Sequence, residues 1–302
     1  MFNIDSQWQH ITVCICTYKR PKYLEYLLEK LNDQQTVGDF TYSIVVVDND
    51  PLFSAKATVN TFQISTGIPV RYEMESRKGY AYARNRAIAC ATGNYVAFID
   101  DDEYPGSDWL LRLYNALEEY GADGILGPVL PQYDGEPPKW VIEGKLCERK
   151  SFKTGTVIQN STDTRTGNVL FKRVLFSNNR EPFDPRFSIS GGEDTDFFRR
   201  MMDKGKIFVW CDEAPVWEWV PKERMQKLYF MERALSRGVA NSKKTRVVSV
   251  DTCKSLAAII FYTIASPVFL LIGEHLFMKF MVRNCDHIGK MLGHVGIKIN
   301  RQ

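Results

Sequence analysis

Short apolar stretches alternate with amphipathic ones through the first third of the chain. Residues 11–16 (ITVCIC), 43–47 (SIVVV) and 95–99 (YVAFI) are short, rich in β-favouring side chains and bounded by turn residues. This is typical of strands buried on both faces, although periodicity alone does not separate such a run from a buried helix. Between them lie an amphipathic segment with leucines at 24, 27, 28 and 31 and an alanine-rich segment at 79–91. The alternation predicts a parallel, doubly wound α/β sheet.

Further elements are predicted beyond residue 105. Residues 124–127 and 207–211 are predicted strands, and residues 128–165 carry mixed turn signals that we interpret as an insertion on the substrate side. Three helices are predicted from apolar spacing, with inner faces formed by Leu110, Leu113, Tyr114 and Leu117; by Phe197, Phe198, Met201 and Met202; and by Leu228, Met231 and Leu235.

Acidic residues stand where two of the predicted strands end. Asp48 and Asp50 follow the second strand, and residues 100–103 (DDDE) follow the third. In open α/β sheets, ligands bind beyond the carboxyl ends of the strands. Clustered carboxylates repel one another, and a hard cation such as Mg²⁺ or Mn²⁺ relieves this, particularly when it is shared with phosphates. We therefore predict a ligand and metal site, with a solvated acidic turn as the alternative.

A second acidic motif, Gly191-Gly-Glu-Asp-Thr-Asp196, opens the helix that carries Phe197. Carboxylates in a first turn interact favourably with the helix dipole, so capping alone explains Asp194 or Asp196. Capping does not require two glycines, however, and glycines allow the backbone to approach another group closely. The motif therefore favours a functional role.

The composition changes after Gly238. Basic residues 243–246 (KKTR) precede the uncharged segment 256–272, which is at the lower limit for spanning a bilayer and is interrupted by Pro267. Positive charges also follow it, and positive flanks on both sides oppose translocation of either end. We expect the segment to lie on or dip into the cytoplasmic leaflet, with its basic flanks on anionic head groups. The alternative is a buried helical hairpin in a soluble homodimer.

Composition narrows the class of protein. The 302 residues carry a net charge of +3, which is too weak to indicate nucleic-acid binding, and 44% are hydrophobic, as in an ordinary folded core. Seven cysteines without CxxC spacing fit a reducing compartment better than a disulfide framework. The first ten residues are polar, so we expect no secretory signal and a cytoplasmic protein.

Five motifs in order resemble the family 2 glycosyltransferases of the GT-A fold. They are TVCICTYKRP (12–21), VVVDND (45–50), ARNRA (83–87), FIDDDE (98–103) and GGEDTD (191–196). Each is weak alone, but five in this order within residues 11–240 are specific. The sequence is most similar to non-processive bacterial enzymes that build exopolysaccharide repeat units of the succinoglycan type.

The resemblance implies an organisation in two parts. Residues 1–240 would form a GT-A domain, a Rossmann-like, mostly parallel sheet flanked by helices, with a nucleotide-binding half (1–105) and an acceptor half (106–240). Residues 241–302 would form a basic, apolar and helical C-terminal segment that associates with the membrane.

The resemblance also implies a nucleotide-sugar donor, which we expect to be a UDP-sugar. Thr17 and Arg20 would line the nucleotide pocket, and Asp48 matches the residue that accepts the uracil N–H. Arg84 matches a position beside the base and phosphates. Its alternative is an exposed arginine on an alanine-rich helix.

The DxD motif of the family falls on Asp100 and Asp102. Asp100 matches the ribose-side acid and is a further metal candidate, and Asp102 matches the ligand of a Mn²⁺ or Mg²⁺ ion that bridges the two phosphates. Such a metal neutralises the charge that develops on the nucleotide diphosphate as it leaves. Asp101 and Glu103 have no assigned role. We expect them either to lie behind the metal ligands, without contact to the metal, or to be solvated.

Asp194 matches the catalytic base of the family, which takes the proton from the attacking hydroxyl. Glu193 would orient acceptor hydroxyls. A single displacement with this base implies inversion, and therefore a β-linkage from an α-linked donor.

Two positions depart from relatives. Many relatives carry a metal-binding histidine after the last core strand, where this chain has Glu218. Glu218 would bind the metal instead, unless it is a solvated strand end and the metal relies on Asp102 and the phosphates. The QxxRW motif of processive relatives is replaced by Met-Glu-Arg233-Ala, which argues against a polymerising synthase.

Side chains near these positions have two interpretations. Arg233, with Arg224 and Arg237 on the same predicted helix, would hold the diphosphate of the leaving group or of a lipid-linked acceptor, or would belong to a solvated face. Three tryptophans would stack on sugar rings or belong to the core; they are Trp140, Trp217 and Trp219.

Together these features predict inverting, metal-dependent transfer of one hexose, which we expect to be glucose, from a UDP-sugar. The acceptor would be a hydroxyl of an oligosaccharide carried on a polyprenyl diphosphate in the cytoplasmic leaflet. The alternative is a non-catalytic nucleotide-sugar-binding or membrane scaffold protein on the same fold. The paired acids at 100 and 102 and at 193 and 194 argue against it, because a binding module needs no base.

Overall fold

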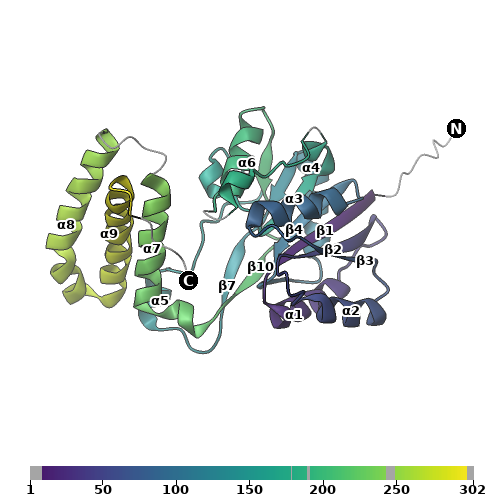
Figure 1. Cartoon of the computed structure of the whole chain (residues 1–302), viewed down its shortest axis with the longest axis horizontal. Coiled ribbons are helices and arrows are strands. Elements are labelled where there is room, and N and C mark those ends of the chain that lie inside the picture. Colours follow the sequence, from purple (N-terminus) through teal and green to yellow (C-terminus); the bar gives the residue numbers. More distant parts are fainter. Residues whose placement is uncertain (1–8, 178, 189–190, 243–248, 298–302) are drawn as a thin grey trace. The chain divides into compact units, whose positions relative to one another are not determined.

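The computed structural model describes residues 9–177, 179–188, 191–242 and 249–297. The chain forms two compact units (Figure 1), Met1–Leu130 with Arg149–Glu218, and Pro131–Glu148 with Trp219–Gln302. Each unit is described by itself. The functional division predicted at residues 105 and 240 stays a prediction.

A seven-stranded sheet forms the centre of the first unit, with the order β3-β2-β1-β4-β8-β6-β9. Neighbouring strands are parallel except where β8 pairs with β4 and with β6. The predicted mostly parallel α/β sheet is confirmed. The strands are β1 (Gln9–Thr17), β2 (Phe40–Asp48), β3 (Val70–Met74), β4 (Tyr95–Asp100), β6 (Gly124–Leu126), β8 (Asn168–Lys172) and β9 (Phe208–Trp210).

Helices cover both faces of this sheet, which explains why its strands are apolar on both sides. Along β1, Val13 and Ile15 pack in one apolar cluster with α1, α2 and α4, while Cys14 packs in the other with α3 and α6. The helices are α1 (Pro21–Asn32), α2 (Lys56–Ser65), α3 (Tyr80–Cys90), α4 (Trp109–Tyr120) and α6 (Glu193–Met202). The short 3₁₀ segments are η1 (Ser161–Asp163), η2 (Arg173–Phe176) and η3 (Pro185–Phe187).

Several elements of the first unit, among them α2, β3, β5 and β8, have no counterpart in the sequence prediction. Only Val59 and Phe62 of α2 are buried, and β3 is a half-buried strand at the edge of the sheet. A helix with two buried side chains and a strand with none give no clear periodicity. The helix α3 ends at Cys90 and continues into extended backbone at Ala91, so Gly93, the next glycine along the chain, does not cap it.

A second, three-stranded sheet has the order β5-β10-β7, formed by β5 (Glu103–Pro105), β10 (Val216–Val220) and β7 (Val129–Tyr133). The antiparallel pairing of β5 with β10 sets Glu103 opposite Glu218. Two acids more than 100 positions apart in the sequence thus become cross-strand neighbours.

The second unit is helical and contains α5 (Lys139–Glu143), η4 (Lys222–Met225), α7 (Lys227–Ser242), α8 (Val250–Ile272) and α9 (Glu274–His294). Within it, α9 packs against both α7 and α8. Gly238 of α7 and Gly289 of α9 lie so close to the opposing backbone that neither site has room for a Cβ. The two helices therefore pack almost backbone to backbone.

The predicted inner face of α7 is wrong at Leu228, which is 62% exposed. The buried residues of the helix are instead Phe230, Ala234, Gly238, Val239 and Ser242. The small residues of this stripe allow the close contact with α9, and that contact decides which face turns inward.

Among the described residues, one helix is long and apolar enough to cross a membrane. This is α8, whose most apolar window has a mean hydropathy of 2.2 and is only 6% buried. Pro267 lies inside the helix and does not end it, contrary to the expected interruption. The basic stretch 243–246, Lys298 and Arg301 lie outside the described residues.

Candidate active site

Thr17 and Arg20 contact the acidic residues that follow β4. Thr17 Oγ1 donates a hydrogen bond of 2.8 Å to Asp101 Oδ2. The Nη1 of Arg20 lies 2.8 Å from Asp101 Oδ1 and 2.9 Å from Asp102 Oδ2. Of the two positions expected for Asp101, the solvated one is wrong and the one behind the metal candidates remains, since the side chain is buried and burial raises its pKa to about 6 against the lowering effect of Arg20. Asp101 fixes Arg20 beside Asp102.

Asp48 is fully buried at the end of β2. Its carboxylate accepts hydrogen bonds from the backbone N–H groups of Asp50 (2.9 Å) and Ala55 (2.8 Å) and from the Tyr72 hydroxyl (3.0 Å). These bonds stabilise the loop after β2 and use three of about four acceptor positions of the carboxylate. The uracil contact of Asp48 stays a prediction.

Arg84 is a buried residue of α3 and not the exposed helix residue of the alternative interpretation. Its Nη1 donates to Glu193 Oε1, and its Nη2 lies 3.6 Å from Asp100 Oδ1. Burial raises the pKa of Glu193, and Arg84 opposes this rise. Arg84 therefore connects the first turn of α6 with the end of β4, and so connects the two acidic motifs.

Asp194 and Asp196 have different surroundings on α6. Asp194 is partly exposed, and its Oδ1 accepts a hydrogen bond of 2.7 Å from the N–H of Thr195. Asp196 forms ion pairs with Arg199 (2.8 Å) and Arg200 (2.7 Å) on the same helix. Both of its carboxylate oxygens are used within α6, whereas Asp194 has acceptor capacity left for a substrate hydroxyl.

The glycine pair before these acids has a conformational role. Gly191 and Gly192 have φ angles of 73° and 95°, a region that side chains other than glycine rarely adopt. A Cβ at either position would meet no atom within 4 Å. The glycines therefore serve the turn that starts α6, and the close approach of another group to their backbone stays a prediction.

Arg149 lies between the two acids that β5 and β10 set opposite each other. Its Nη2 pairs with Glu218, and its Nη1 lies 3.8 Å from Glu103 Oε1. Of the two positions expected for Glu103, the solvated one is wrong and the one behind the metal candidates remains, since the side chain is buried and burial raises its pKa well above its ordinary value. Sequence reasoning missed Arg149 because it stands in the stretch 128–165, which has no motif.

The described residues include no group of three or more His, Cys, Asp or Glu side chains that would hold a metal by themselves. The donor set still fits a hard cation, because Asp100 and Asp102 offer carboxylate oxygens and the Asp100 side chain is 44% exposed. Such a cation usually keeps only one or two carboxylates and completes its shell with water and substrate phosphates. Asp102 and Asp100 fit a metal bound in that way.

Comparison with known proteins identifies the family. A model described as "Glycosyl transferase family 2" matches residues 12–178, more than half of the chain. The chain is a family 2 glycosyltransferase. The family resemblance of the five motifs is thereby confirmed, and the non-catalytic scaffold alternative receives no support.

Curated relatives of this glycosyltransferase agree with the family. The succinoglycan biosynthesis protein ExoM of Rhizobium meliloti is 31% identical over 243 residues, which cover 80% of this chain and 76% of ExoM. The glucosyl-dolichyl phosphate glucuronosyltransferase of Haloferax volcanii is 28% identical over 68% of this chain and 61% of that protein. Poly(ribitol-phosphate) beta-glucosyltransferase of Bacillus spizizenii is 33% identical over 65% of this chain and 30% of that protein.

Solved structures confirm the GT-A fold. The mannosyltransferase PcManGT from Pyrobaculum calidifontis, in complex with GDP-Man and Mn²⁺, has a TM-score of 0.62 and 16% identity over 96% of this chain and 88% of that chain. S. aureus TarS 1–349 in complex with UDP has a TM-score of 0.54 and 16% identity over 95% and 90% of the two chains.

Three other residues considered in the sequence analysis belong to the second unit of the glycosyltransferase. Arg233 belongs to α7 of the second unit, and its role as a diphosphate ligand stays a prediction. Arg237 of the same helix pairs with Asp286 of α9 at 3.0 Å. Trp140 is buried against Phe230, which favours the core interpretation for this tryptophan.

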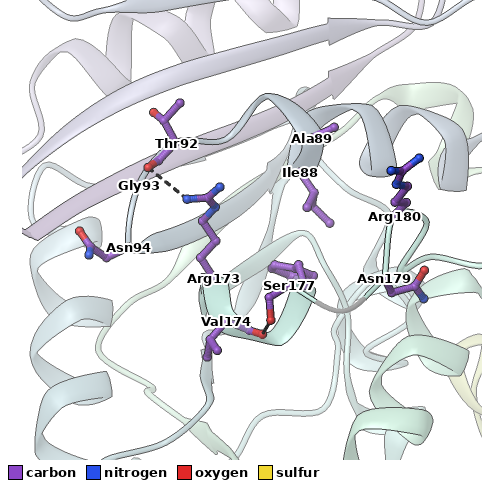
Figure 2. A pocket seen from close by; sticks show the side chains of 11 residues that line it. Ile88, Ala89, Thr92, Gly93, Asn94, Arg173, Val174, Ser177, Asn179 and Arg180 are labelled. Carbon is purple, nitrogen blue, oxygen red and sulfur yellow. Dashed lines mark hydrogen bonds between the residues drawn. The ribbon is translucent and has the colours of Figure 1, made fainter.

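The glycosyltransferase has a further hollow of about 1030 Å³ where β4 begins, at the opposite end of this strand from Asp100. Figure 2 shows Arg173 and Arg180 among its lining side chains, together with Thr92 and Asn94 from the turn before β4. None of the predicted site residues lines it. The hollow is therefore separate from the candidate active site.

Proposed function

We propose that this glycosyltransferase transfers one hexose, glucose, from a UDP-sugar to a hydroxyl of a lipid-linked oligosaccharide, with inversion and in exopolysaccharide synthesis. The observation that supports it most is the Arg84 bridge, since Arg84 pairs with Glu193 at the start of α6 and faces Asp100 at the end of β4. The buried guanidinium of Arg84 thereby holds together Asp100, the acid on the donor side, and the acidic motif that carries Asp194, the proposed base. The names of ExoM, a succinoglycan biosynthesis protein, and of the poly(ribitol-phosphate) beta-glucosyltransferase agree with this polymer class and sugar.

The donor would bind at the carboxyl ends of β1, β2 and β4. Arg20, which Asp101 holds in place, would face the phosphates of the donor, and Asp102 with Asp100 would hold Mn²⁺ or Mg²⁺. Such an ion acts as a Lewis acid on the departing diphosphate. The protein itself would hold the carboxylates in position and would place the positive charges of Arg20 and Arg84 before the reaction begins.

The acceptor hydroxyl would approach α6 and transfer its proton to Asp194. The oxygen then forms a bond to the anomeric carbon as the bond to the nucleotide diphosphate breaks, which inverts the configuration. Glu193 is held by Arg84, so it orients the first turn of α6; its Oε2 is buried and has no hydrogen-bond partner among the described residues, and contact of Glu193 with acceptor hydroxyls stays a prediction.

Calorimetric titration of UDP, GDP and dTDP, each with and without Mn²⁺, tests the donor assignment. We expect UDP to bind at least about tenfold more tightly than the others, and Mn²⁺ to tighten it at least about tenfold, or about 1.4 kcal/mol each. Asp102→Asn should remove the effect of Mn²⁺ and keep the nucleotide preference. A preference for GDP would overturn the UDP assignment, and binding unaffected by Mn²⁺ would overturn the metal assignment.

We also propose that α8 lies in the plane of the cytoplasmic leaflet and does not cross it. Contacts that hold α8 against α9 include Asn284 to Thr263 (3.2 Å), His287 to Ser255 (3.2 Å) and the stacked rings of Phe280 and Phe269. A crossing α8 would therefore take α9 into the hydrocarbon, including its charged residues Lys279, Arg283, Asp286 and Lys290. Each charge costs about 2.5–3.5 kcal/mol at the centre of a bilayer.

An in-plane arrangement suits both helices. The exposed side of α8 is apolar, and Lys279, Arg283 and Lys290 recur on one flank of α9 at spacing that places them near head groups. The turn between the helices is also fixed within the unit, since Glu274 pairs with Lys227 and His275 lies 3.1 Å from Glu143. The exposed apolar residues are Leu256, Ile260, Phe261, Ile264, Val268, Leu270, Leu271 and Ile272.

Sedimentation with vesicles that contain anionic lipid tests this arrangement. Ile264→Lys should weaken binding by about 10–100-fold, because an exposed apolar side chain is replaced by a charge at the expected lipid contact. Leu228→Lys is the matched control, since Leu228 is a similarly exposed residue of α7, and it should bind as the parent does. Equal loss in both variants, or a parent that dimerises and ignores vesicles, would contradict the proposal and favour the homodimer.

A further inference from the structure

We propose that Arg149, and not a metal ion, is the partner of Glu218 in the working enzyme, and that Arg149 positions the DxD segment and adds a positive charge facing the donor diphosphate. The inference rests on the proposed function. It assigns a role to a residue of the motif-free stretch 128–165 and separates Glu218 from the metal ligands.

Arg149 is held from two sides. Its Nη2 pairs with Glu218 and its Nη1 lies 3.8 Å from Glu103 Oε1, while its side chain is only 19% exposed. A metal bound to Glu218 would compete with Arg149 for this carboxylate and would place a divalent charge beside the guanidinium. If the ion pair opened, a largely buried guanidinium would lose its closest partner, which is strongly unfavourable.

Arg149 also reaches the DxD segment through Glu103. The second carboxylate oxygen of Glu103 accepts a hydrogen bond of 3.2 Å from the backbone N–H of Asp100. Gly167, which precedes β8, leaves the space between the acids open, since a Cβ there would lie 2.7 Å from Glu103 Oε1 and 3.0 Å from Asp100 Oδ2. Arg149 is therefore connected to Asp100 through one side chain, that of Glu103.

The charges around Asp100 explain why an arginine is needed here. Arg84 contacts Glu193 and Asp100, and Arg20 contacts Asp101 and Asp102, so two arginines already face four acids before Glu103 and Glu218 are counted. Arg149 interacts electrostatically with Glu218, Glu103, Asp100 and Asp102. A nucleotide diphosphate adds further negative charge, and a divalent ion supplies only two positive charges. Arg149 reduces the repulsion that the diphosphate meets in this acidic site.

Manganese titration followed by electron paramagnetic resonance, with saturating UDP, tests the assignment of Glu218. We expect Glu218→Gln to bind Mn²⁺ within about threefold of the parent, whereas Asp102→Asn should lose at least about tenfold. A tenfold loss in Glu218→Gln, from a parent that binds UDP, would make Glu218 a metal ligand and overturn this inference alone. A parent that binds no UDP would overturn the proposed function and this inference with it.

The role of Arg149 is tested by UDP affinity in the absence of metal. Arg149→Met should weaken UDP by about tenfold and Arg149→Lys by less, because the lysine keeps the charge. Lys150→Met is the matched control, since Lys150 is adjacent, exposed and paired with Asp163 at 2.6 Å, and it should bind UDP as the parent does. If Arg149→Met does not fold, Arg149→Met/Glu218→Gln removes the unpaired acid and takes its place. UDP affinity that is unchanged in the folded variant, or equally weak in Lys150→Met, would overturn the role.

Discussion

Replacing Asp194 by asparagine should slow sugar transfer by about 10²–10⁴-fold, the usual contribution of a general base. UDP affinity should change by less than about twofold, because Asp194 accepts hydrogen bonds from Thr195 on its own helix, which is not among the residues assigned to the donor. Asparagine keeps the size of the side chain and the acceptor for the Thr195 N–H, but it does not take up a proton. Transfer rates with a lipid-linked acceptor, together with UDP titration, measure the two effects.

Asp196→Asn is the control for this experiment. Asp196 lies two residues further along α6 and is paired with Arg199 and Arg200, so its loss should leave transfer within a few-fold of the parent. A fully active Asp194→Asn variant would refute the base assignment. Equal inactivation by both substitutions would indicate damage to α6 and not the loss of a base.

Replacing Arg84 by methionine should lower the free energy of unfolding by about 3–5 kcal/mol, the usual cost of removing one partner of a buried ion pair. Methionine retains much of the packing volume of the arginine stem, so the effect isolates the charge. Glu193 would remain buried at the start of α6 without its hydrogen-bonded partner. Urea denaturation of parent and variant gives the difference.

The loss in Arg84→Met should depend on pH. Burial raises the pKa of Glu193 above its ordinary value of 4.5, so the favourable contribution of this carboxyl is present below that value and lost as the pH rises through the folded-state value. Arg84 opposes the rise, so the variant should lose more stability at pH 8 than at pH 5. Arg84→Met/Glu193→Gln should recover most of the loss at pH 8, and a double variant no more stable than Arg84→Met would contradict this explanation.

Much of the first unit follows from the sequence because its strands are buried on both faces. The runs around Val13, Val45 and Ala97 are apolar at almost every position, and the four leucines of α1 are all buried as their spacing predicts. Which face of α7 is buried cannot be predicted from the sequence in the same way. Its glycine and alanine stripe, at Ala234 and Gly238, turns inward because small side chains allow contact with α9, whereas Leu228 stays outside.

The candidate site is predictable in part. Short motifs at the ends of strands indicated that Thr17, Arg20 and Asp100 share one edge of the sheet, because parallel strands end together. The ion-pair partners that hold these residues in place could not be predicted, because an ion pair depends on where a loop lies in space. Arg149 reaches Glu218 across 69 positions without any periodic signal in between.

The apolar cluster of the second unit has a practical consequence for shortened forms of the chain. Trp140, Phe230 and Met278 pack together, and Met278 belongs to α9. A protein ending at residue 240 would lack that helix and leave Trp140, Phe230 and the glycine stripe of α7 uncovered, an apolar surface of the kind that promotes aggregation. A soluble catalytic fragment is thus better sought by placing polar residues on the exposed side of α8 than by removing the C-terminal helices.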